Sequence, residues 1–287
     1  MHDLDFLEPT TLQEVCHLMA QYGEDARLMA GGTALMLALR QRLVTPAQLV
    51  SVARVPELRG IHVGDDQVLT IGAFTTHSEV ASSELIQQHA PMLASMASQV
   101  ANWQVRNQGT MGGNLCYADP ATDPPGCLLA LEAEVVLQGP LQQRVLPMAE
   151  FLVDYYETAL QADEVLVAIR LPAPQSRARG SYWRHLKTPA DHRPLVNVSI
   201  NSVQTDTAVD AVCLVVGAST PFPLRLQSAN ALLAQRPTAS LIQSVAQAAA
   251  QEIDALSDAR ASADYRREMV RVLVGRALSA HFNLSCM

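Results

Sequence analysis

The sequence predicts an α+β fold built from more than one lobe. Strand patterns and helix patterns both recur before residue 174, and from Gly180 onward three strand patterns are followed by three helix patterns. Between these two parts, Pro172 and Pro174 begin a stretch of Gln, Ser, Arg and Gly that is typical of a linker. A chain of 287 residues is long enough for one large domain or for two to three small ones.

Composition and charge narrow the classes of protein. With 49% hydrophobic and 17% charged residues, the chain is globular. Its net charge of -8 argues against nucleic-acid binding, which requires a basic surface to displace counterions. The N-terminus lacks a basic region followed by an apolar core, and no apolar run approaches the roughly 20 residues of a membrane span. We therefore expect a cytoplasmic protein without a membrane span, although a partner subunit could carry an export signal for a complex.

The secondary structure can be predicted from caps, periodicity and turn residues. Thr11 and Glu14 form a capping-box pattern ahead of an amphipathic helix. Thr75 and Thr76 end a β-rich run, where a hydroxyl can cap the next helix. The expected helices are 11–22, 34–42, 91–100, 227–234, 240–253 and 262–280. The expected strands are 27–30, 48–52, a hairpin ending at 69–73, 134–138, 164–171, 181–186, 194–203 and 208–217.

A Gly-Gly pair in the middle of the chain is the first candidate for ligand binding. Gly112 and Gly113 lie between Thr110 and Asn114, and glycine permits positive φ and close approach of a ligand. We predict a loop whose backbone N–H groups, together with the Thr110 hydroxyl, converge on an anionic oxygen such as that of a phosphate. The apolar run that follows Pro125 indicates that the segment is held in a packed core.

A second Gly-Gly pair lies upstream. An apolar strand runs into Gly31, Gly32 and Thr33, and an apolar helix follows, so that its dipole would favour an anion at the turn. Two phosphate loops suggest a pyrophosphate. Neither segment matches the Rossmann pattern G-x-G-x-x-G or the Walker pattern, and each pair taken singly is also compatible with a plain tight turn.

The five cysteines do not predict a metal site or a disulfide framework. They are odd in number, scattered, and contain no C-x-x-C pair. We expect them to be small buried apolar residues. They are Cys16, Cys116, Cys127, Cys213 and Cys286.

The two glycine pairs and several other segments of the chain together resemble a known family. This family is the FAD-binding or medium subunits of the xanthine dehydrogenase and carbon monoxide dehydrogenase family of molybdenum hydroxylases. The resemblance rests on AGGTALMLALR at 30–40, IGAFTTHSEV at 71–80 and VRNQGTMGGNLCYADPATDPPGCLLALEAEVVL at 105–137. It continues through DEVLVAIRLP at 163–172, YWRHLKTPAD at 182–191 and DYRREMVRVLVGRAL at 264–278, and therefore spans nearly the whole chain.

The resemblance implies a two-lobed FAD-binding domain of the vanillyl-alcohol-oxidase-like (PCMH) type followed by a C-terminal α+β domain. The implied boundaries are an N-terminal lobe at 1–58, a middle lobe at 59–174 and a C-terminal domain at 178–287. An iron-sulfur insertion that some relatives carry in this subunit is absent from the sequence.

The family's cofactor-binding positions carry over residue by residue. By resemblance, Asp123 falls where an aspartate hydrogen-bonds hydroxyls of the cofactor. The family usually has Tyr-x-Lys near the flavin, whereas this chain has Arg184, so either Arg184 or Lys187 takes the lysine's place. The full implied set is Ala30, Gly31, Gly32, Thr33, Ala34, Thr75, Thr110, Gly112, Gly113, Asn114, Asp123, Arg184 and Lys187.

The resemblance also implies a function. The chain would be an FAD-carrying electron-transfer subunit that receives electrons from 2Fe-2S clusters of a small subunit and passes them to NAD, oxygen or a quinone. The substrate would be oxidised at a molybdenum-pterin centre in a large subunit, and a dimer of heterotrimers is expected. Two alternatives remain open from the residues alone, a stand-alone FAD oxidoreductase and a scaffold subunit that has lost its flavin.

The sequence offers no catalytic set of its own. It contains no Ser/His/Asp set, carboxylate pair or metal cluster typical of a self-sufficient hydrolase. This pattern favours a subunit whose cofactor performs the chemistry, so we expect no catalytic side chain and no metal ligand. The intact glycine pairs argue against the scaffold alternative.

Overall fold

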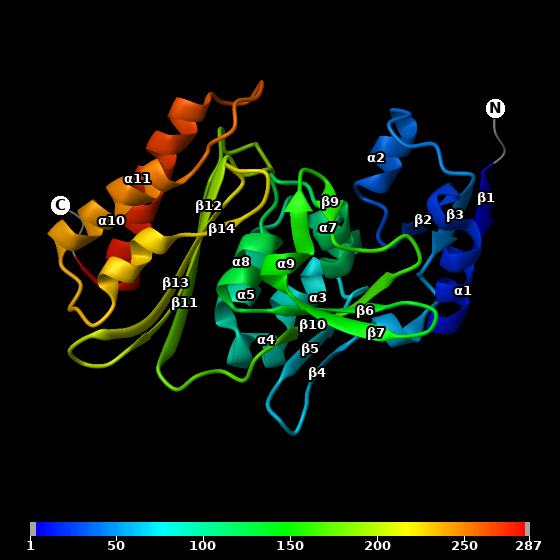
Figure 1. Cartoon of the computed structure of the whole chain (residues 1–287), viewed down its shortest axis with the longest axis horizontal. Coiled ribbons are helices and arrows are strands. Elements are labelled where there is room, and N and C mark those ends of the chain that lie inside the picture. The colour runs from blue at the N-terminus through cyan, green and yellow to red at the C-terminus, as the bar shows by residue number, and fades with distance from the viewer. Residues whose placement is uncertain (1–3, 285–287) are drawn as a thin grey trace.

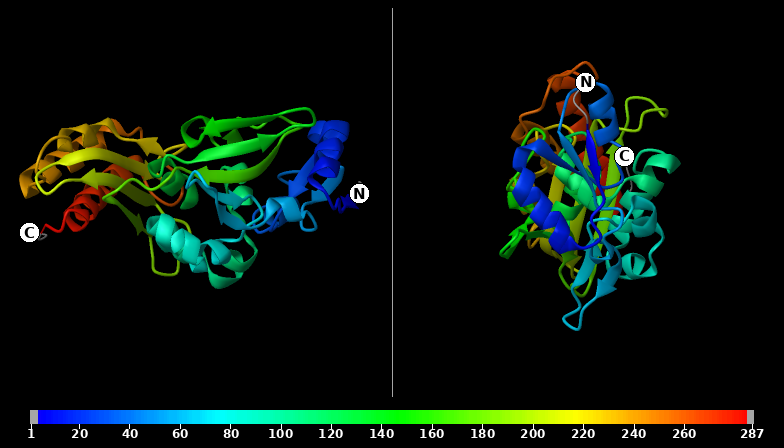
Figure 2. Two further views of the ribbon diagram at one scale, coloured as in Figure 1. Left: turned by 90° about the horizontal axis from the view of Figure 1, so that it is seen from below. Right: turned by 90° about the vertical axis from the view of Figure 1, so that its right-hand side faces the viewer.

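The computed structural model describes residues 4–284, which form sheets of three, five and four strands and a two-stranded ribbon. The sheets follow one another along the molecule, so that β1 and α11 lie at opposite ends of an elongated chain (Figures 1 and 2). Mixed helices and strands confirm the predicted α+β class. The sheets lie within 5–51, 61–171 and 178–225.

The N-terminal lobe is a small parallel sheet with the order β1-β3-β2. Thr11 caps α1 in a complete capping box with Glu14, as predicted. Val15 and Met19 of this helix are buried against the sheet. The elements are β1 (Asp5–Leu7), α1 (Leu12–Tyr22), β2 (Ala26–Met29), α2 (Leu35–Arg40) and β3 (Gln48–Ser51).

The middle lobe is an antiparallel sheet with the order β4-β5-β10-β6-β7. Helices α3, α4 and α5 lie on one side of it, below the strands in the left view of Figure 2. Met92 and Met96 of α5 are buried in its core. The strands are β4 (Ile61–Val63), β5 (Leu69–Gly72), β6 (Glu134–Gln138), β7 (Gln143–Pro147) and β10 (Val165–Leu171), with a ribbon of β8 (Leu152–Asp154) and β9 (Glu157–Thr158). The helices are α3 (His77–Ser82), α4 (Glu84–His89), α5 (Pro91–Gln99), α6 (Trp103–Gln108), α7 (Met111–Tyr117), α8 (Pro124–Ala130) and α9 (Met148–Phe151).

The C-terminal part is an antiparallel sheet with the order β11-β12-β13-β14. Helices α10 and α11 cover one face, while α5 and α8 of the middle lobe contact the sheet from the other side (Figure 1). The elements are β11 (Ala178–His185), β12 (Val196–Gln204), β13 (Val209–Gly217), β14 (Leu224–Arg225), α10 (Ala239–Glu252) and α11 (Ala263–His281).

Strand β11 is shared between two cores. Its side chains alternate, so Tyr182 packs in the core of the middle lobe and Trp183 packs against the core of the C-terminal part. The C-terminal sheet is thereby fastened directly to the lobe that holds the second glycine pair.

Three sequence predictions need correction. Gly112 and Gly113 lie inside α7, so the expected loop is a helix. Residues 227–232 form a 3₁₀ helix instead of an α-helix. Strand β7 and the ribbon β8–β9 were not predicted, because their exposed, mixed composition gives no clear alternation.

The cysteines and the helices can be compared with the expectations for burial and for a membrane span. Cys16, Cys127 and Cys213 are buried as expected, whereas the side chain of Cys116 is exposed, and Cys286 lies outside the described residues. Across residues 4–284, no helix has the length and apolar character required to cross a membrane.

Candidate functional site

The first glycine pair forms a tight turn between β2 and α2. Gly32 has φ of +70°, a conformation that favours glycine. A Cβ on Gly31 would lie 1.7 Å from the carbonyl oxygen of Gln108, so only glycine fits against the end of α6. The turn is therefore fixed in shape by its own conformation and by the neighbouring helix.

The same turn presents free hydrogen-bond donors. Within the part of the chain that the structure describes, the backbone N–H groups of Gly31, Gly32 and Thr33 have no protein acceptor, and neither does the Thr33 hydroxyl. These residues are half-buried. Consecutive backbone donors around a residue with positive φ form the concave arrangement that binds anionic oxygens. The turn therefore has free donors of the kind that a phosphate loop needs, and phosphate binding at this turn stays a prediction.

The second glycine pair is built differently. The N–H of Gly113 donates to the hydroxyl of Thr110 at 3.1 Å, and the N–H of Gly112 donates to the Ala73 carbonyl at 2.9 Å. A Cβ on Gly112 would lie 2.6 Å from that of Ala73. The glycines therefore allow α7 to pack closely, and their N–H groups are already used. The prediction of a loop with converging free donors at this pair was wrong.

The two glycine pairs nevertheless lie side by side. A Cβ on Gly113 would be 3.5 Å from the Cβ of Ala30, and one on Gly109 would be 3.4 Å from the Thr33 hydroxyl. Ala34 follows as the N-cap residue of α2, without a side-chain cap. The N-terminal end of α7 thus forms one wall beside the first turn.

Thr75 is a structural contact of this wall. It is buried, its hydroxyl donates to the Gly60 carbonyl at 3.2 Å, and its own carbonyl accepts from the Met111 N–H at 2.9 Å. The neighbouring Thr76 caps α3 in a complete capping box. The predicted capping role therefore belongs to Thr76.

Asn114 connects this wall to Asp123. Its amide nitrogen donates to the Thr122 hydroxyl at 2.7 Å, and the Thr122 carbonyl accepts from Asn197 of β12 at 2.8 Å. The amide oxygen of Asn114 is buried without a protein partner. An unpaired buried oxygen is costly, so it marks a position where a ligand donor would be favourable.

Asp123 lies at the far end of the same path. It occupies the N-cap position of α8, but its side chain makes no cap hydrogen bond, and neither Pro124 nor Pro125 has an N–H group. Its carboxylate accepts hydrogen bonds from the Tyr182 hydroxyl and, at 3.2 Å, from Arg184. Burial raises the pKa of Asp123 to about 6, and the hydrogen bonds from these two residues oppose that rise.

Lys187 lies apart from these contacts. It is exposed on the connection between β11 and β12, and no ion pair or hydrogen bond involves it within residues 4–284. Asp191 in the same connection is half-buried. The structure therefore brings Arg184 to Asp123 and leaves Lys187 at the surface.

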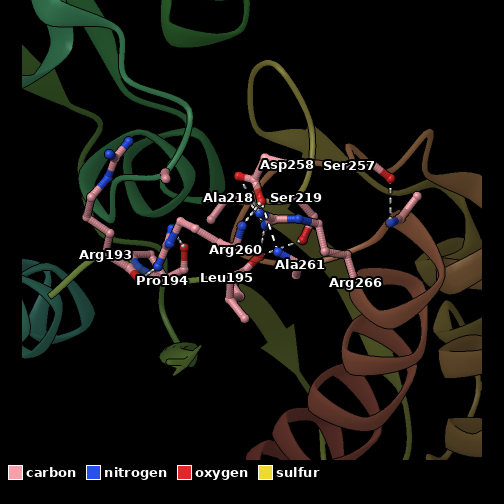
Figure 3. Close-up of polar contacts among 12 residues, drawn as sticks. Arg193, Pro194, Leu195, Ala218, Ser219, Ser257, Asp258, Arg260, Ala261 and Arg266 are labelled. Atoms are coloured by element: carbon pink, nitrogen blue, oxygen red, sulfur yellow. Dashed lines mark hydrogen bonds and ion pairs between the residues drawn. The ribbon is translucent and has the colours of Figure 1, made fainter. Parts of the chain in front are cut away.

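The end of this connection is tied down from two sides. Arg193 forms an ion pair with Asp119 at 2.5 Å, and Asp119 also accepts a hydrogen bond from the Ala121 N–H at 2.9 Å. On the other side, Arg260 donates to the carbonyls of Arg193 and Pro194 (Figure 3). These contacts hold the β11–β12 connection next to the segment that leads to Asp123.

A buried arginine anchors the same region from α11. Arg266 donates to the carbonyls of Leu195 and Ala218 at 2.8 and 2.9 Å and pairs with Asp258 (Figure 3). Its side chain is almost fully buried, so these partners satisfy a charge that would otherwise be costly to bury. Arg266 fixes the start of β12 relative to the long C-terminal helix.

His77 lies beside the two glycine pairs and is not among the residues that the sequence analysis names. It lies at the start of α3, and a Cβ on Gly109 would lie 3.2 Å from its ring and 3.4 Å from the Thr33 hydroxyl. The side chain is buried, Nδ1 has no protein partner, and burial lowers the pKa of His77 to about 4. In the sequence His77 directly follows Thr75 and Thr76, and its burial depends on residues that are distant in the chain.

Comparison with known protein families identifies the family of this chain. Residues 2–174 match the family described as the FAD binding domain in molybdopterin dehydrogenase, and residues 181–281 match the CO dehydrogenase flavoprotein C-terminal domain. The chain belongs to the FAD-binding medium subunits of the molybdenum hydroxylase family. The predicted family and the predicted FAD cofactor are thereby confirmed, and so is the order of an FAD-binding domain followed by a C-terminal α+β domain.

Relatives of this medium subunit cover almost its whole length. The carbon monoxide dehydrogenase medium chain of Hydrogenophaga pseudoflava is 33% identical over 96% of each chain. Subunit alpha of the 6-hydroxypseudooxynicotine dehydrogenase complex of Paenarthrobacter nicotinovorans is 30% identical over 96% of this chain and 93% of its own.

Solved structures are similar over the same extent. The medium subunit superposes on a chain of carbon monoxide dehydrogenase from Hydrogenophaga pseudoflava with a TM-score of 0.94, at 33% identity and 98% coverage of both chains. A chain of quinoline 2-oxidoreductase from Pseudomonas putida 86 gives a TM-score of 0.92 at 26% identity, with 98% of this chain and 97% of that chain covered.

The residues present fit FAD on structural grounds. The first turn offers free N–H donors suited to an anionic pyrophosphate, and the unpaired Asn114 oxygen and the Asp123 carboxylate offer acceptors suited to hydroxyl groups. They follow one another from the turn along α7 to β11. This succession of donors for an anion and acceptors for a polyol matches the chemical order of a dinucleotide that carries a sugar alcohol.

Proposed function

We propose that this chain is the electron-transfer subunit of a multi-subunit molybdenum hydroxylase. In that role it accepts electrons from 2Fe-2S clusters of a small subunit and passes them to NAD, oxygen or a quinone. Bound FAD supplies the redox chemistry, because it can exchange electrons one or two at a time. The relatives named as carbon monoxide and 6-hydroxypseudooxynicotine dehydrogenase subunits support this proposal.

The first turn would hold the pyrophosphate. The N–H groups of Gly31, Gly32 and Thr33 are free to donate to it, and Ala30 and Ala34 flank them. Backbone donors at a turn with positive φ bind anions without a charged side chain. This single observation carries the proposal, because these donors otherwise face no acceptor.

The end of α7 would support that turn and continue the site. Thr110 caps the helix, while Gly112 and Gly113 let it pack against Ala73 and Ala30, and Thr75 ties its first N–H in place. We assign these residues to shaping the cofactor wall. Direct contact with the cofactor from this helix is proposed for Asn114, whose amide oxygen has no protein partner.

The sugar-alcohol chain would lie against Asp123, with a cation close to the flavin ring. Arg184 is proposed for the position of the family's lysine, because it is held at Asp123, whereas Lys187 is exposed. Lys187 is the only lysine in the sequence, so amine-reactive labelling of its peptide can decide between them. We expect FAD to leave the labelling rate of Lys187 unchanged, and strong protection by FAD would transfer the role to Lys187.

The partners are proposed from the same family membership. A large molybdenum-pterin subunit and a small iron-sulfur subunit would complete the complex, as a dimer of heterotrimers in the cytoplasm. The division into lobes at 1–58 and 59–174 and a domain at 178–287 is proposed for this chain on the basis of its separate sheets.

The test is the visible spectrum of the purified full-length chain, together with chromatography of the cofactor released by heat. We expect a flavin spectrum and released FAD, and we expect iron and molybdenum to accompany the chain only when its complex is purified. A chain that stays colourless after incubation with FAD, both alone and with its partners, would overturn the proposal.

A further inference from the structure

The surroundings of Asp123 contain a contact that the proposed function does not use. The hydroxyl of Tyr182 donates to one carboxylate oxygen of Asp123, while Arg184 donates to the other. Tyr182 and Arg184 are two residues apart on β11, so both point to the same face of the strand. Each oxygen of Asp123 therefore has one protein donor and keeps capacity for a further hydrogen bond.

This arrangement crosses from one part of the molecule to another. Asp123 begins α8 of the middle lobe, whereas Tyr182 belongs to the C-terminal sheet. The tyrosine ring is buried in the middle-lobe core and is held there by packing, so its hydroxyl has little freedom to turn away. Asn197 of the adjacent strand fixes the preceding residue through the Thr122 carbonyl.

From this geometry we infer that Tyr182 is a positioning residue for the cofactor. It holds the Asp123 carboxylate ionised and in one orientation, so that Asp123 accepts a hydrogen bond from a hydroxyl of the cofactor's polyol chain. The inference rests on the proposed function, since it takes the bound molecule to be FAD. It assigns to the C-terminal part a role in cofactor binding that operates through Asp123.

The charge state of Asp123 follows from the groups that face it. Burial raises its pKa to about 6, and donation from Tyr182 and then the charge of Arg184 act in the opposite direction. Burial and the neighbouring carboxylate hold the pKa of Tyr182 well above its usual value, so its hydroxyl remains a donor. Cys127 of α8 also faces Asp123, and burial raises the pKa of this thiol so that it stays neutral.

The affinity for FAD should depend on the charge of Asp123. An ionised carboxylate accepts a hydroxyl hydrogen bond better than a protonated one, so FAD affinity should fall as the pH drops through about 6. Removing the Tyr182 hydroxyl removes a donor that favours the ionised form. The pKa of Asp123 should then rise, and the loss of affinity should begin at higher pH.

The experiment is a series of FAD titrations of the full chain, followed by flavin fluorescence, from about pH 5 to about pH 9. For Tyr182→Phe, we expect the midpoint of the affinity loss to move up by about one pH unit. Tyr155→Phe is the matched control, because Tyr155 is an exposed tyrosine away from this contact, and its profile should overlay that of the wild type. Asp123→Asn should bind FAD more weakly and remove the transition.

Combining the variants separates a specific role from general damage. If Tyr182 acts through Asp123, then Tyr182→Phe has no further effect in the Asp123→Asn background. A Tyr182→Phe profile that overlays the wild type, or an equal additional loss in both backgrounds, would overturn the inference. If this variant does not fold, Tyr182→Met, which also lacks the hydroxyl, takes its place, with the same upward shift expected and an unshifted profile contradicting the inference.

The failure of the proposed function has a different signature. A wild-type chain that binds no FAD at any pH would overturn that function and the inference with it. Wild-type binding with an unaltered Tyr182→Phe profile overturns the inference alone. His77 does not confuse the result, because its pKa of about 4 lies below the tested range.

Discussion

The same dipeptide, Gly-Gly, performs two different tasks in this subunit. At Gly31 and Gly32 it makes a turn with positive φ whose N–H groups have no protein acceptor within the described residues. At Gly112 and Gly113 it lies in a helix whose N–H groups are already hydrogen-bonded. The comparison shows that glycine can be required either for donor geometry or for close packing, and that the backbone hydrogen bonds tell these cases apart.

The largest expected effect comes from adding a methyl group to the first turn. In Gly31→Ala, the Cβ would lie 1.7 Å from the Gln108 carbonyl oxygen, so the turn must move and its donors must separate. Loss of two charge-assisted hydrogen bonds corresponds to a roughly 100-fold weaker affinity for FAD. Flavin fluorescence titration measures this change. Unchanged affinity would show that these donors do not hold the cofactor.

The corresponding change in the second pair should act on stability. In Gly112→Ala, the new Cβ would be 2.6 Å from that of Ala73, which is overpacking of a buried contact. We expect a loss of about 2 kcal/mol in the free energy of unfolding. Urea denaturation of the apoprotein measures it, and the folded fraction should keep its FAD affinity within about threefold. A folded Gly112→Ala protein without FAD affinity would break the comparison.

The contact between the two pairs should be sensitive to pH through His77. Burial lowers the pKa of His77 to about 4, so the unfolded chain binds a proton at higher pH than the folded chain does. The contribution of neutral His77 to the free energy of unfolding is fully present above about pH 6.5. It is lost as the pH falls towards 4, by about 3 kcal/mol at most.

His77→Gln isolates this contribution. Thermal unfolding between these pH values should lose part of its pH dependence in the variant. His281 provides a reference, because burial also lowers its pKa to about 4 but it lies in the C-terminal helix α11. If the stability of His77→Gln depends on pH as strongly as that of the wild type, titration of His77 does not affect the region between the two glycine pairs.

The smallest effects should come from the two threonines that accompany the glycine pairs. Thr110 caps α7 through the Gly113 N–H, so Thr110→Val should cost about 1 kcal/mol of stability and leave FAD binding unchanged. Thr33 has no hydrogen-bond partner in the described part of the protein, so Thr33→Val should weaken FAD binding several-fold without affecting stability. Thermal unfolding and FAD titration of both variants measure these effects. If Thr110→Val weakened FAD binding and Thr33→Val reduced stability, the roles of the two glycine pairs would be exchanged.

Local features of the fold could be predicted from the sequence because they depend on neighbouring residues. The capping box at Thr11 and the hairpin between β4 and β5 depend on short-range patterns that carry their own signal. The first glycine turn belongs to this group, since a strand, two glycines and a helix follow one another directly. Positive φ occurs in this turn, at Gly32, whereas Gly112 and Gly113, where the sequence analysis noted that glycine permits it, lie in a helix.

The misjudged or missed features depend on contacts between distant residues. Gly112 was expected in a loop, but the requirement for glycine comes from Ala73, which lies far away in the sequence. The same reason explains why Tyr182 was overlooked, because its value depends on Asp123, 59 residues earlier. Burial is likewise a property of the folded chain, so the shifted pKa of His77 had no signal in the sequence.

The most direct test of the central assignment compares FAD with riboflavin, which lacks both the pyrophosphate and the adenosine, in the wild type and in variants of the two glycine pairs. If the free donors at Gly31, Gly32 and Thr33 hold that group, the wild-type chain should bind FAD on the order of 100-fold more tightly than riboflavin, as expected for two charge-assisted hydrogen bonds. Gly31→Ala should close most of this gap, while Gly112→Ala should preserve it. Equal affinities of the wild type for FAD and riboflavin would contradict the assignment of the first glycine turn to the pyrophosphate.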